Sequence, residues 1–226
     1  MSRNVSMIEA MPSAAPNKIA VLAEVPLPGR CLPDLLAAHA PEWVAGLYAA
    51  MLRDTLDGLL SIDASEYVVY AADDEAAIAL AAHVPAPWRI VAGVVDASAA
   101  FASLGATDGS AILARSDAPS APIMPILEAL AASSAARSVM LGPSEDGRAW
   151  LVGARGHDTL VADLPWGSPE LVATMRVRCT KASVTLRELP IATIVDQPSA
   201  VLALLEELRR HPERAPRTAQ FVVTHA

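Results

Sequence analysis

The amino-acid sequence predicts an α/β fold in three layers, with a mostly parallel sheet between two layers of helices. Short apolar runs that suit buried strands alternate with longer segments whose apolar side chains recur every three or four residues, as in helices. The chain has 226 residues, of which 53% are hydrophobic and 19% are charged. This is enough apolar material to pack one domain of the larger α/β kind.

The expected strands are apolar runs bounded by loop-forming residues. KIAVLAE at 18–24 is such a run, and the prolines and glycine of VPLPGR at 25–30 end it. In chain order, the expected strands are 18–24, 66–72, 88–95, 110–115, 139–141, 149–153 and 183–189. Ligands of such sheets bind beyond the carboxyl ends of the strands, so the loops that follow them are expected to converge on one cleft.

The expected helices combine an apolar stripe with a capping residue or an early proline. Residues 41–60 carry apolar side chains at helical spacing, and Asp73 or Asp74 can accept hydrogen bonds from the free N–H groups of the next helix. In chain order, the expected helices are 41–60, 75–83, 97–104, 122–132, 168–180 and 198–210.

Three segments differ in composition. Residues 1–17 lack the continuous apolar core of a signal peptide and are expected to form a flexible arm. Residues 18–211 are expected to form the single domain. Residues 212–226 are polar and contain proline before a short FVV stretch, so we expect a tail or an edge strand there.

The charge and cysteine content exclude several classes of partner. The formal net charge is −8, whereas a general nucleic-acid binder needs a basic face. No apolar run reaches the roughly 18 residues that span a bilayer, so no membrane partner is expected. Cys31 and Cys179 are far apart in the sequence, which argues against a disulfide or zinc site and favours the reducing cytoplasm. The apolar content is compatible with a homodimer.

Three common catalytic motifs are absent from the sequence. It contains no GxxxxGK[ST] phosphate loop, no GxGxxG dinucleotide fingerprint and no GxSxG nucleophile elbow. The five histidines do not have metal-ligand spacing. The motifs that point to function must therefore be of another kind.

Five short segments, in order, carry a resemblance to one family. They are AEVPLPGR at 23–30, SDAP at 116–119, LGPSEDGRAWLVG at 141–153, PWGSP at 165–169 and DQP at 196–198. They are similar to A-K-x-P-x-P-G-x, G-S-D-x-P, L-G-P-x-x-D-G-G-Y-Y-L-L-G, P-W-S-T-P and D-T-P-E-D of the DUF2064 group of GT-A-type glycosyltransferases. That group is also called radical-SAM/selenodomain-associated transferase 1. The chain resembles a divergent member of it over roughly residues 18–208.

The resemblance implies a GT-A fold that binds a nucleotide-diphospho-sugar and a divalent cation, Mg²⁺ or Mn²⁺. It assigns Asp117 and Asp146 to catalysis, and Asp117 and Asp196 to the metal. The nucleotide-binding positions that it implies are Ala23, Glu24, Pro28, Gly29 and Arg30. The substrate-binding positions are Gly142, Pro143, Glu145, Gly147, Arg148, Trp166 and Ser168. A cation held by carboxylates would stabilise the charge that develops on a leaving diphosphate.

The sequence departs from the family pattern where positive charge is expected. The first loop has Leu32 and Asp34 in place of a lysine and an arginine, whereas Arg115 and Arg148 replace glycines. A carboxylate beside a diphosphate is repulsive. Either Arg115 and Arg148 supply the missing positive charge from other loops, or the catalytic apparatus has decayed.

The alternatives that remain are a nucleotidyltransferase of the guanylyltransferase type and a non-catalytic binding protein on the same scaffold. Ordinary structural roles also stay open for single residues. Asp117 could be a turn residue, and Asp196 could favour a helix dipole. Trp166 could pack beneath its loop, and Ser168 could be a helix N-cap.

Overall fold

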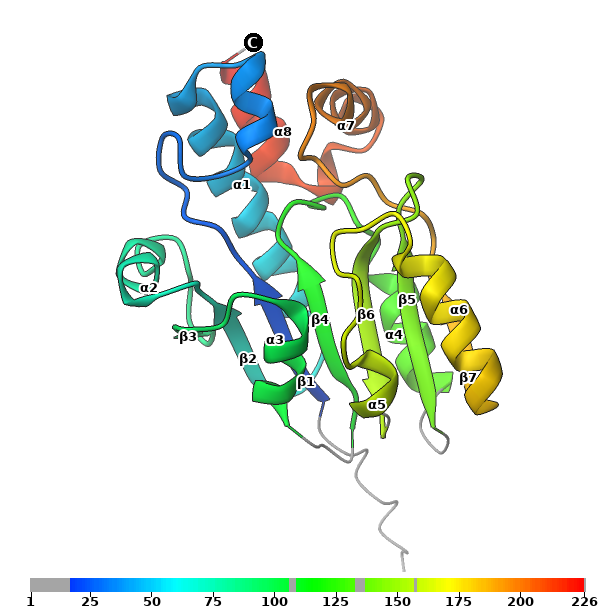
Figure 1. Ribbon diagram of the computed structural model, residues 1–226. Helices are drawn as coiled ribbons and strands as arrows, with labels where there is room; N and C mark the ends of the chain where they lie inside the picture. Colours follow the sequence, from blue (N-terminus) through cyan, green and yellow to red (C-terminus); the bar gives the residue numbers. More distant parts are fainter. Residues whose placement is uncertain (1–16, 106–108, 133–136, 157, 226) are drawn as a thin grey trace, which may run out of the picture.

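The computed structural model describes residues 17–105, 109–132, 137–156 and 158–225 (Figure 1). The N-terminal arm expected at 1–17 therefore lies outside the described residues, except for Asn17, which begins the first strand.

One sheet of seven strands forms the middle of the described structure. The strands are β1 (Asn17–Leu22), β2 (Ala64–Tyr70), β3 (Arg89–Val91), β4 (Ala111–Arg115), β5 (Ser138–Pro143), β6 (Ala149–Arg155) and β7 (Thr185–Glu188). Their order is β3-β2-β1-β4-β6-β5-β7. β6 runs antiparallel to both of its neighbours, and the other pairs are parallel, so the expectation of a mostly parallel sheet is confirmed.

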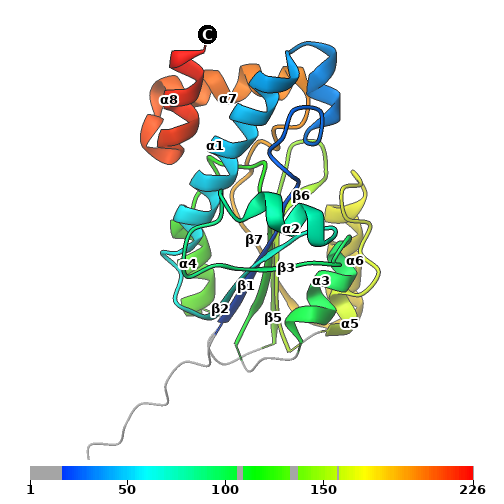
Figure 2. The same cartoon turned by 90° about the vertical axis from the view of Figure 1, so that its left-hand side faces the viewer.

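Helices cover both faces of the sheet, which confirms the three layers (Figure 2). The helices are α1 (Pro41–Leu59), α2 (Asp74–Leu80), α3 (Ala97–Leu104), α4 (Met124–Ala132), α5 (Asp158–Val161), α6 (Leu171–Ala182), α7 (Pro198–Arg210) and α8 (Pro216–Thr224). Two short 3₁₀ helices, η1 (Pro33–Ala37) and η2 (Pro212–Arg214), precede α1 and α8. One core joins the sheet to α1, α2, α4, α7 and α8, and a second joins it to α3, α5 and α6. No helix among the described residues is both long and apolar enough to cross a membrane.

The expected strands and helices are all found, with differences at their ends. The Asp73 side chain caps α2 by accepting a hydrogen bond from the N–H of Ala76, as predicted. Strand β3 is shorter than expected because Gly93 has a φ of 83°, which takes the chain out of the extended conformation. Helix α6 begins only at Leu171, since Ser168 forms a turn in front of it instead of capping it.

The C-terminal segment is a helix, not the tail or edge strand that the sequence suggested. Helix α8 lies along α1 (Figure 1). The two helices approach closely at Gly46, where an added Cβ atom would lie 2.5 Å from the ring of Phe221. Trp43 also packs at 5.8 Å from that ring. The FVV stretch reads as a strand in isolation, but this contact favours the helix.

A buried aspartate fixes the first turn of α8. The carboxylate of Asp54, on α1, accepts hydrogen bonds from the N–H of Arg217 at 3.1 Å and the N–H of Thr218 at 2.8 Å. It also accepts the Thr218 hydroxyl at 2.7 Å. Because the first N–H groups of a helix lack partners within the helix, this carboxylate caps α8 from a distant part of the chain.

We expect Asp54→Asn to destabilise the protein by about 1–3 kcal/mol, because in either orientation the new amide NH₂ would face a backbone N–H, of Arg217 or of Thr218, which can only donate. Chemical denaturation measures the change. Asp57→Asn is the matched control, since Asp57 lies on the same helix, is 37% exposed and pairs with Arg53 and Arg217 near the surface. Equal effects of the two substitutions would contradict the capping role.

Candidate active site

A cavity of about 380 Å³ lies beyond the carboxyl ends of β1, β2 and β4, where ligands of parallel sheets bind. Its wall includes residues that follow each of these strands. The residues that line it include Ala23, Glu24, Arg30, Tyr48, Arg115, Ser116, Asp117 and Trp166. A second cavity of about 280 Å³ is lined in part by Glu145, Asp146, Arg148 and Asp196.

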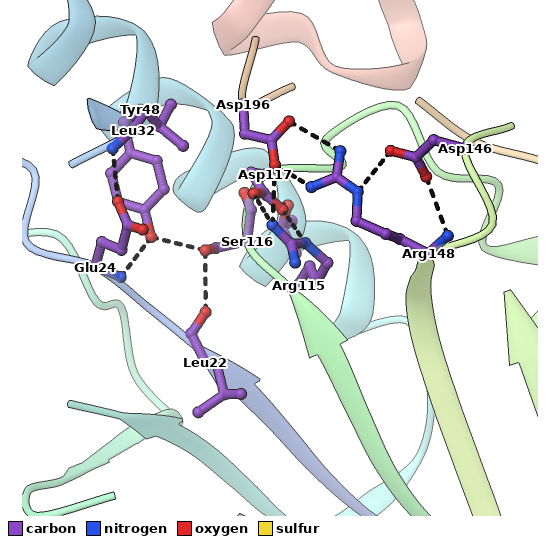
Figure 3. Close-up of polar contacts among 11 residues, drawn as sticks. Leu22, Glu24, Leu32, Tyr48, Arg115, Ser116, Asp117, Asp146, Arg148 and Asp196 are labelled. Atoms are coloured by element: carbon purple, nitrogen blue, oxygen red, sulfur yellow. Dashed lines mark hydrogen bonds and ion pairs between the residues drawn. The ribbon is translucent and has the colours of Figure 1, made fainter. Parts of the chain in front are cut away.

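The loop after β1 folds back on itself through Glu24. The carboxylate of Glu24 accepts a hydrogen bond from the N–H of Leu32 at 2.6 Å (Figure 3). Leu32 has a φ of 45°, which is uncommon for a residue with a side chain, and it is 2% exposed. Its burial and this hydrogen bond hold the backbone in that conformation. Removal of water raises the pKa of Glu24, and nearby Asp117 adds to the rise, although the Leu32 N–H opposes it.

A chain of hydrogen bonds ties this loop to β4 (Figure 3). The N–H of Glu24 donates to the Tyr48 hydroxyl at 2.7 Å, and that hydroxyl lies 2.7 Å from the Ser116 hydroxyl. The Ser116 hydroxyl donates to the carbonyl of Leu22 at 3.0 Å. Since the single proton of Ser116 is used in that bond, Tyr48 donates to Ser116. Burial raises the pKa of Tyr48 above its ordinary value, so its hydroxyl stays protonated and can donate this hydrogen bond.

Arg115, the last residue of β4, holds Asp117 in a two-pronged ion pair. Its Nε and Nη2 atoms donate to the two carboxylate oxygens of Asp117 at 2.8 Å and 2.6 Å. Nη2 also lies 3.6 Å from the carboxylate of Asp196. Burial lowers the pKa of Arg115, but the neighbouring carboxylates outweigh it and the net shift is upward.

Arg148, at the end of the turn before β6, binds Asp146 and also binds Asp196 (Figure 3). Its Nε donates to Asp146 at 2.5 Å, and its Nη2 donates to Asp196 at 3.0 Å. A third bond joins its Nη1 to Asp196. These hydrogen bonds, those to Asp196 most of all, raise the pKa of Arg148. Asp196 is thus in contact with both arginines.

The topology explains why distant residues meet here. Because β6 is antiparallel, the turn between β5 and β6 lies at the same edge of the sheet as the carboxyl ends of β1 and β4. The turn is closed by the Ser144 N–H, which donates to the Arg148 carbonyl at 2.8 Å. Asp196 is drawn in by the Val195 N–H, which donates to the Asp117 carbonyl at 2.7 Å.

The structure brings together only part of the residues that the resemblance assigned to the site. Ala23, Glu24, Arg30, Asp117 and Trp166 line the larger cavity. The smaller cavity is lined by Glu145, Asp146, Arg148 and Asp196. Arg30 points to Glu75, with which it forms an exposed ion pair at 2.6 Å.

The remaining assigned residues line neither of these two cavities. Pro28 and Gly29 lie in the exposed loop after β1. Gly142 and Pro143 are buried at the end of β5, where a Cβ on Gly142 would lie 2.4 Å from the Trp150 ring. The glycine at position 142 is thus explained by packing.

Gly147 and Ser168 have structural contacts beside the site. Gly147 has a φ of 85°, and a Cβ there would lie 2.3 Å from the Pro169 carbonyl oxygen. Glycine is therefore required for this turn to approach α6. Ser168 accepts a hydrogen bond from the Glu170 N–H at 3.2 Å.

Sequence reasoning missed Tyr48, which is fully buried within the apolar stripe of α1 and reads there as core. Its hydroxyl gives no sequence signal, because its partners Glu24 and Ser116 come from two other segments. The sequence pointed to Arg148 as a substrate-binding residue and to both Arg115 and Arg148 as replacements for the missing positive charge. Their pairing with three carboxylates was not foreseen.

These contacts bear on the expected cation site. A Mg²⁺ or Mn²⁺ ion needs carboxylate oxygens that are open to it. Both oxygens of Asp117 and both of Asp196 already accept hydrogen bonds from guanidinium groups. The described residues include no group of three or more His, Cys, Asp or Glu side chains that could hold a metal ion. The side chains as arranged therefore do not fit a divalent cation.

The fold superposes on that of a nucleotide-diphospho-sugar transferase structure, so the expected fold class is confirmed. A solved protein assigned as a nucleotide-diphospho-sugar transferase from Desulfovibrio desulfuricans G20 superposes with a TM-score of 0.79 at 19% identity. The match covers 92% of this chain and 94% of that one.

Two further solved structures share the fold more distantly. Rv0371c from Mycobacterium tuberculosis H37Rv, in complex with manganese, has a TM-score of 0.55 at 18% identity, over 86% of this chain and 100% of that one. The 4-diphosphocytidyl-2C-methyl-D-erythritol synthase from Anaerococcus prevotii DSM 20548 has a TM-score of 0.54 at 9% identity, over 87% of this chain and 100% of that one. No protein-family model and no curated protein sequence matches the chain.

The Asp146 ion pair predicts a pH dependence of stability. Partial burial opposes ionisation of Asp146, but hydrogen bonds from the backbone and guanidinium group of Arg148 outweigh it and lower the pKa below 3.8. The folded state therefore binds fewer protons than the unfolded state near that pH. The contribution of this ion pair to stability is complete at pH values above the pKa that Asp146 has in the unfolded state. It is lost as the pH falls through the lower pKa that Asp146 has in the folded state.

We therefore expect the free energy of unfolding to fall less steeply in Asp146→Asn than in the wild type as pH decreases from 5 toward 3. Urea titrations at several pH values measure the slope. Asp34→Asn removes an exposed carboxylate from η1 as the control. An unchanged slope in Asp146→Asn would rule out this ion pair as a contributor.

Proposed function

We propose that the protein is a nucleotide-sugar-binding transferase whose nucleotide occupies the cavity beyond β1, β2 and β4. The observation that carries the proposal is the position and lining of this cavity. It lies at the carboxyl edge of a sheet of the nucleotide-diphospho-sugar transferase fold, between the loop after β1 and the Arg115–Asp117 pair.

The lining suits a ligand with an apolar ring and an anionic end. Val94, Val95 and Trp166 provide apolar surface in the wall of the cavity. Arg30 and Arg115 provide guanidinium groups, which suit phosphate oxygens because their N–H donors form a planar fork. The smaller cavity, beyond Asp196, is the proposed place of the sugar or acceptor.

A second candidate is a nucleotidyltransferase, which would take a nucleoside triphosphate in the same cavity. The shared fold with the diphosphocytidyl-methylerythritol synthase supports it. We also propose that the protein is a divergent member of the DUF2064 group, that it is cytoplasmic and that it forms a homodimer. Asp117 and Asp146 are its proposed catalytic carboxylates, and the loop at 23–30 is its proposed nucleotide contact.

We expect thermal-shift and calorimetric titrations to detect binding of a nucleoside diphosphate or its sugar conjugate. Uridine, guanosine, cytidine and adenosine forms are tested as diphosphates, diphospho-sugars and triphosphates. Preference for a diphospho-sugar supports the glycosyltransferase, and preference for a triphosphate supports the nucleotidyltransferase. Binding of none of these ligands would overturn the proposal and favour a scaffold with another ligand.

Filling the cavity tests its location. Ala72 lines the cavity and is exposed, so Ala72→Trp is expected to fold normally and to weaken nucleotide binding at least about tenfold, or about 1.4 kcal/mol. Ala182→Trp, at the exposed end of α6, is the control for the added indole. Equal affinities of the wild type and Ala72→Trp would place the ligand elsewhere.

A further inference from the structure

Two guanidinium groups stand among the carboxylates that the resemblance assigned to a divalent cation. Arg115 binds both oxygens of Asp117 and lies 3.6 Å from Asp196, whereas Arg148 bridges Asp146 and Asp196. The arginine side chains are 17% and 13% exposed. They are therefore built into the wall of the site and are not mobile surface charges.

The charge of these groups is permanent. Arginine stays protonated throughout the physiological pH range, and the neighbouring carboxylates raise the pKa of both side chains further. Two guanidinium groups carry the same total charge as one divalent ion. Three carboxylates outnumber them, but Asp146 is 44% exposed, so water screens the excess negative charge.

We propose that Arg115 and Arg148 take the place of the divalent cation in this protein, so that it binds the diphosphate of its nucleotide without a metal ion. This inference rests on the proposed nucleotide site. Asp117 and Asp196 then orient the guanidinium groups instead of binding a metal ion.

Arg115 retains the donors that such a role requires. Its Nε and Nη2 atoms are engaged by Asp117, whereas Nη1 forms no hydrogen bond with any residue in the described part of the chain. Arg115 also lines the larger cavity. Its Nη1 is thus available to a phosphate oxygen while the Asp117 pair holds the rest of the fork in place.

The test measures binding of Mn²⁺ and of nucleotide separately. Mn²⁺ is titrated alone into the protein and followed by electron paramagnetic resonance, where bound ions lose the signal of free Mn²⁺. Nucleoside diphosphates and diphospho-sugars are then titrated calorimetrically in EDTA and in Mn²⁺. For the wild type we expect no Mn²⁺ binding, and nucleotide affinities in the two buffers that agree within about twofold.

Arg148→Gln provides the complementary arm, because it frees Asp146 and Asp196 from their shared partner. We expect this variant to bind Mn²⁺ and to bind nucleotide at least about tenfold more weakly in EDTA than the wild type does. Arg176→Gln is the matched control, since Arg176 also holds a carboxylate with two hydrogen bonds, to Glu188, but lies outside both cavities. It should behave as the wild type.

The outcomes separate this inference from the proposed function. If the wild type binds nucleotide only with Mn²⁺, the proposed function stands and the replacement of the cation by arginine is wrong. If no nucleotide binds in either buffer, the proposed function fails and so does metal-free diphosphate binding. The wild-type titrations decide the inference even if Arg148→Gln does not fold.

Discussion

The contact on which the site depends is the one between Asp196 and two arginines from separate loops. Arg115 ends β4, Arg148 ends the turn between β5 and β6, and Asp196 precedes α7. These charges are largely removed from water, so each needs its partners. Loss of one partner of such a pair typically costs about 3–5 kcal/mol, because an uncompensated charge remains buried. The network therefore sets the spacing of the three loops.

A neutral network fixes the other side of the larger cavity. The Glu24 N–H, Tyr48, Ser116 and the Leu22 carbonyl form a directed chain in which each donor has an acceptor. Ser116 is adjacent in sequence to both Arg115 and Asp117, so the neutral chain and the charged network meet at the end of β4. The cleft is consequently tied both to α1 and to the segment before α7, which pre-organises it for a ligand.

Most of the fold could be predicted from the sequence because its signals are local. Apolar runs predicted the strands, and the cap at Asp73 and the stripe of residues 41–60 predicted helices. The C-terminal helix was missed because its support is not local. It depends on Gly46 and Asp54, which lie on α1 and come into contact only when the chain is folded.

The candidate site was less predictable than the fold. The family resemblance pointed to Asp117, Asp146 and Asp196, and the structure places all three in one network. The resemblance did not reveal what binds them. In the sequence alone, an aspartate that pairs with arginine cannot be told from an aspartate that binds a metal ion. Only the geometry shows that Arg115 and Arg148 satisfy these carboxylates.

The most direct measurement is an anomalous difference map from a crystal grown with a nucleoside diphosphate and Mn²⁺. We expect diphosphate density against Arg115, both guanidinium groups in their present contacts and no manganese peak among the three aspartates. A manganese peak at about 2.0–2.2 Å from Asp117 and Asp196, with the arginines displaced, would contradict this expectation.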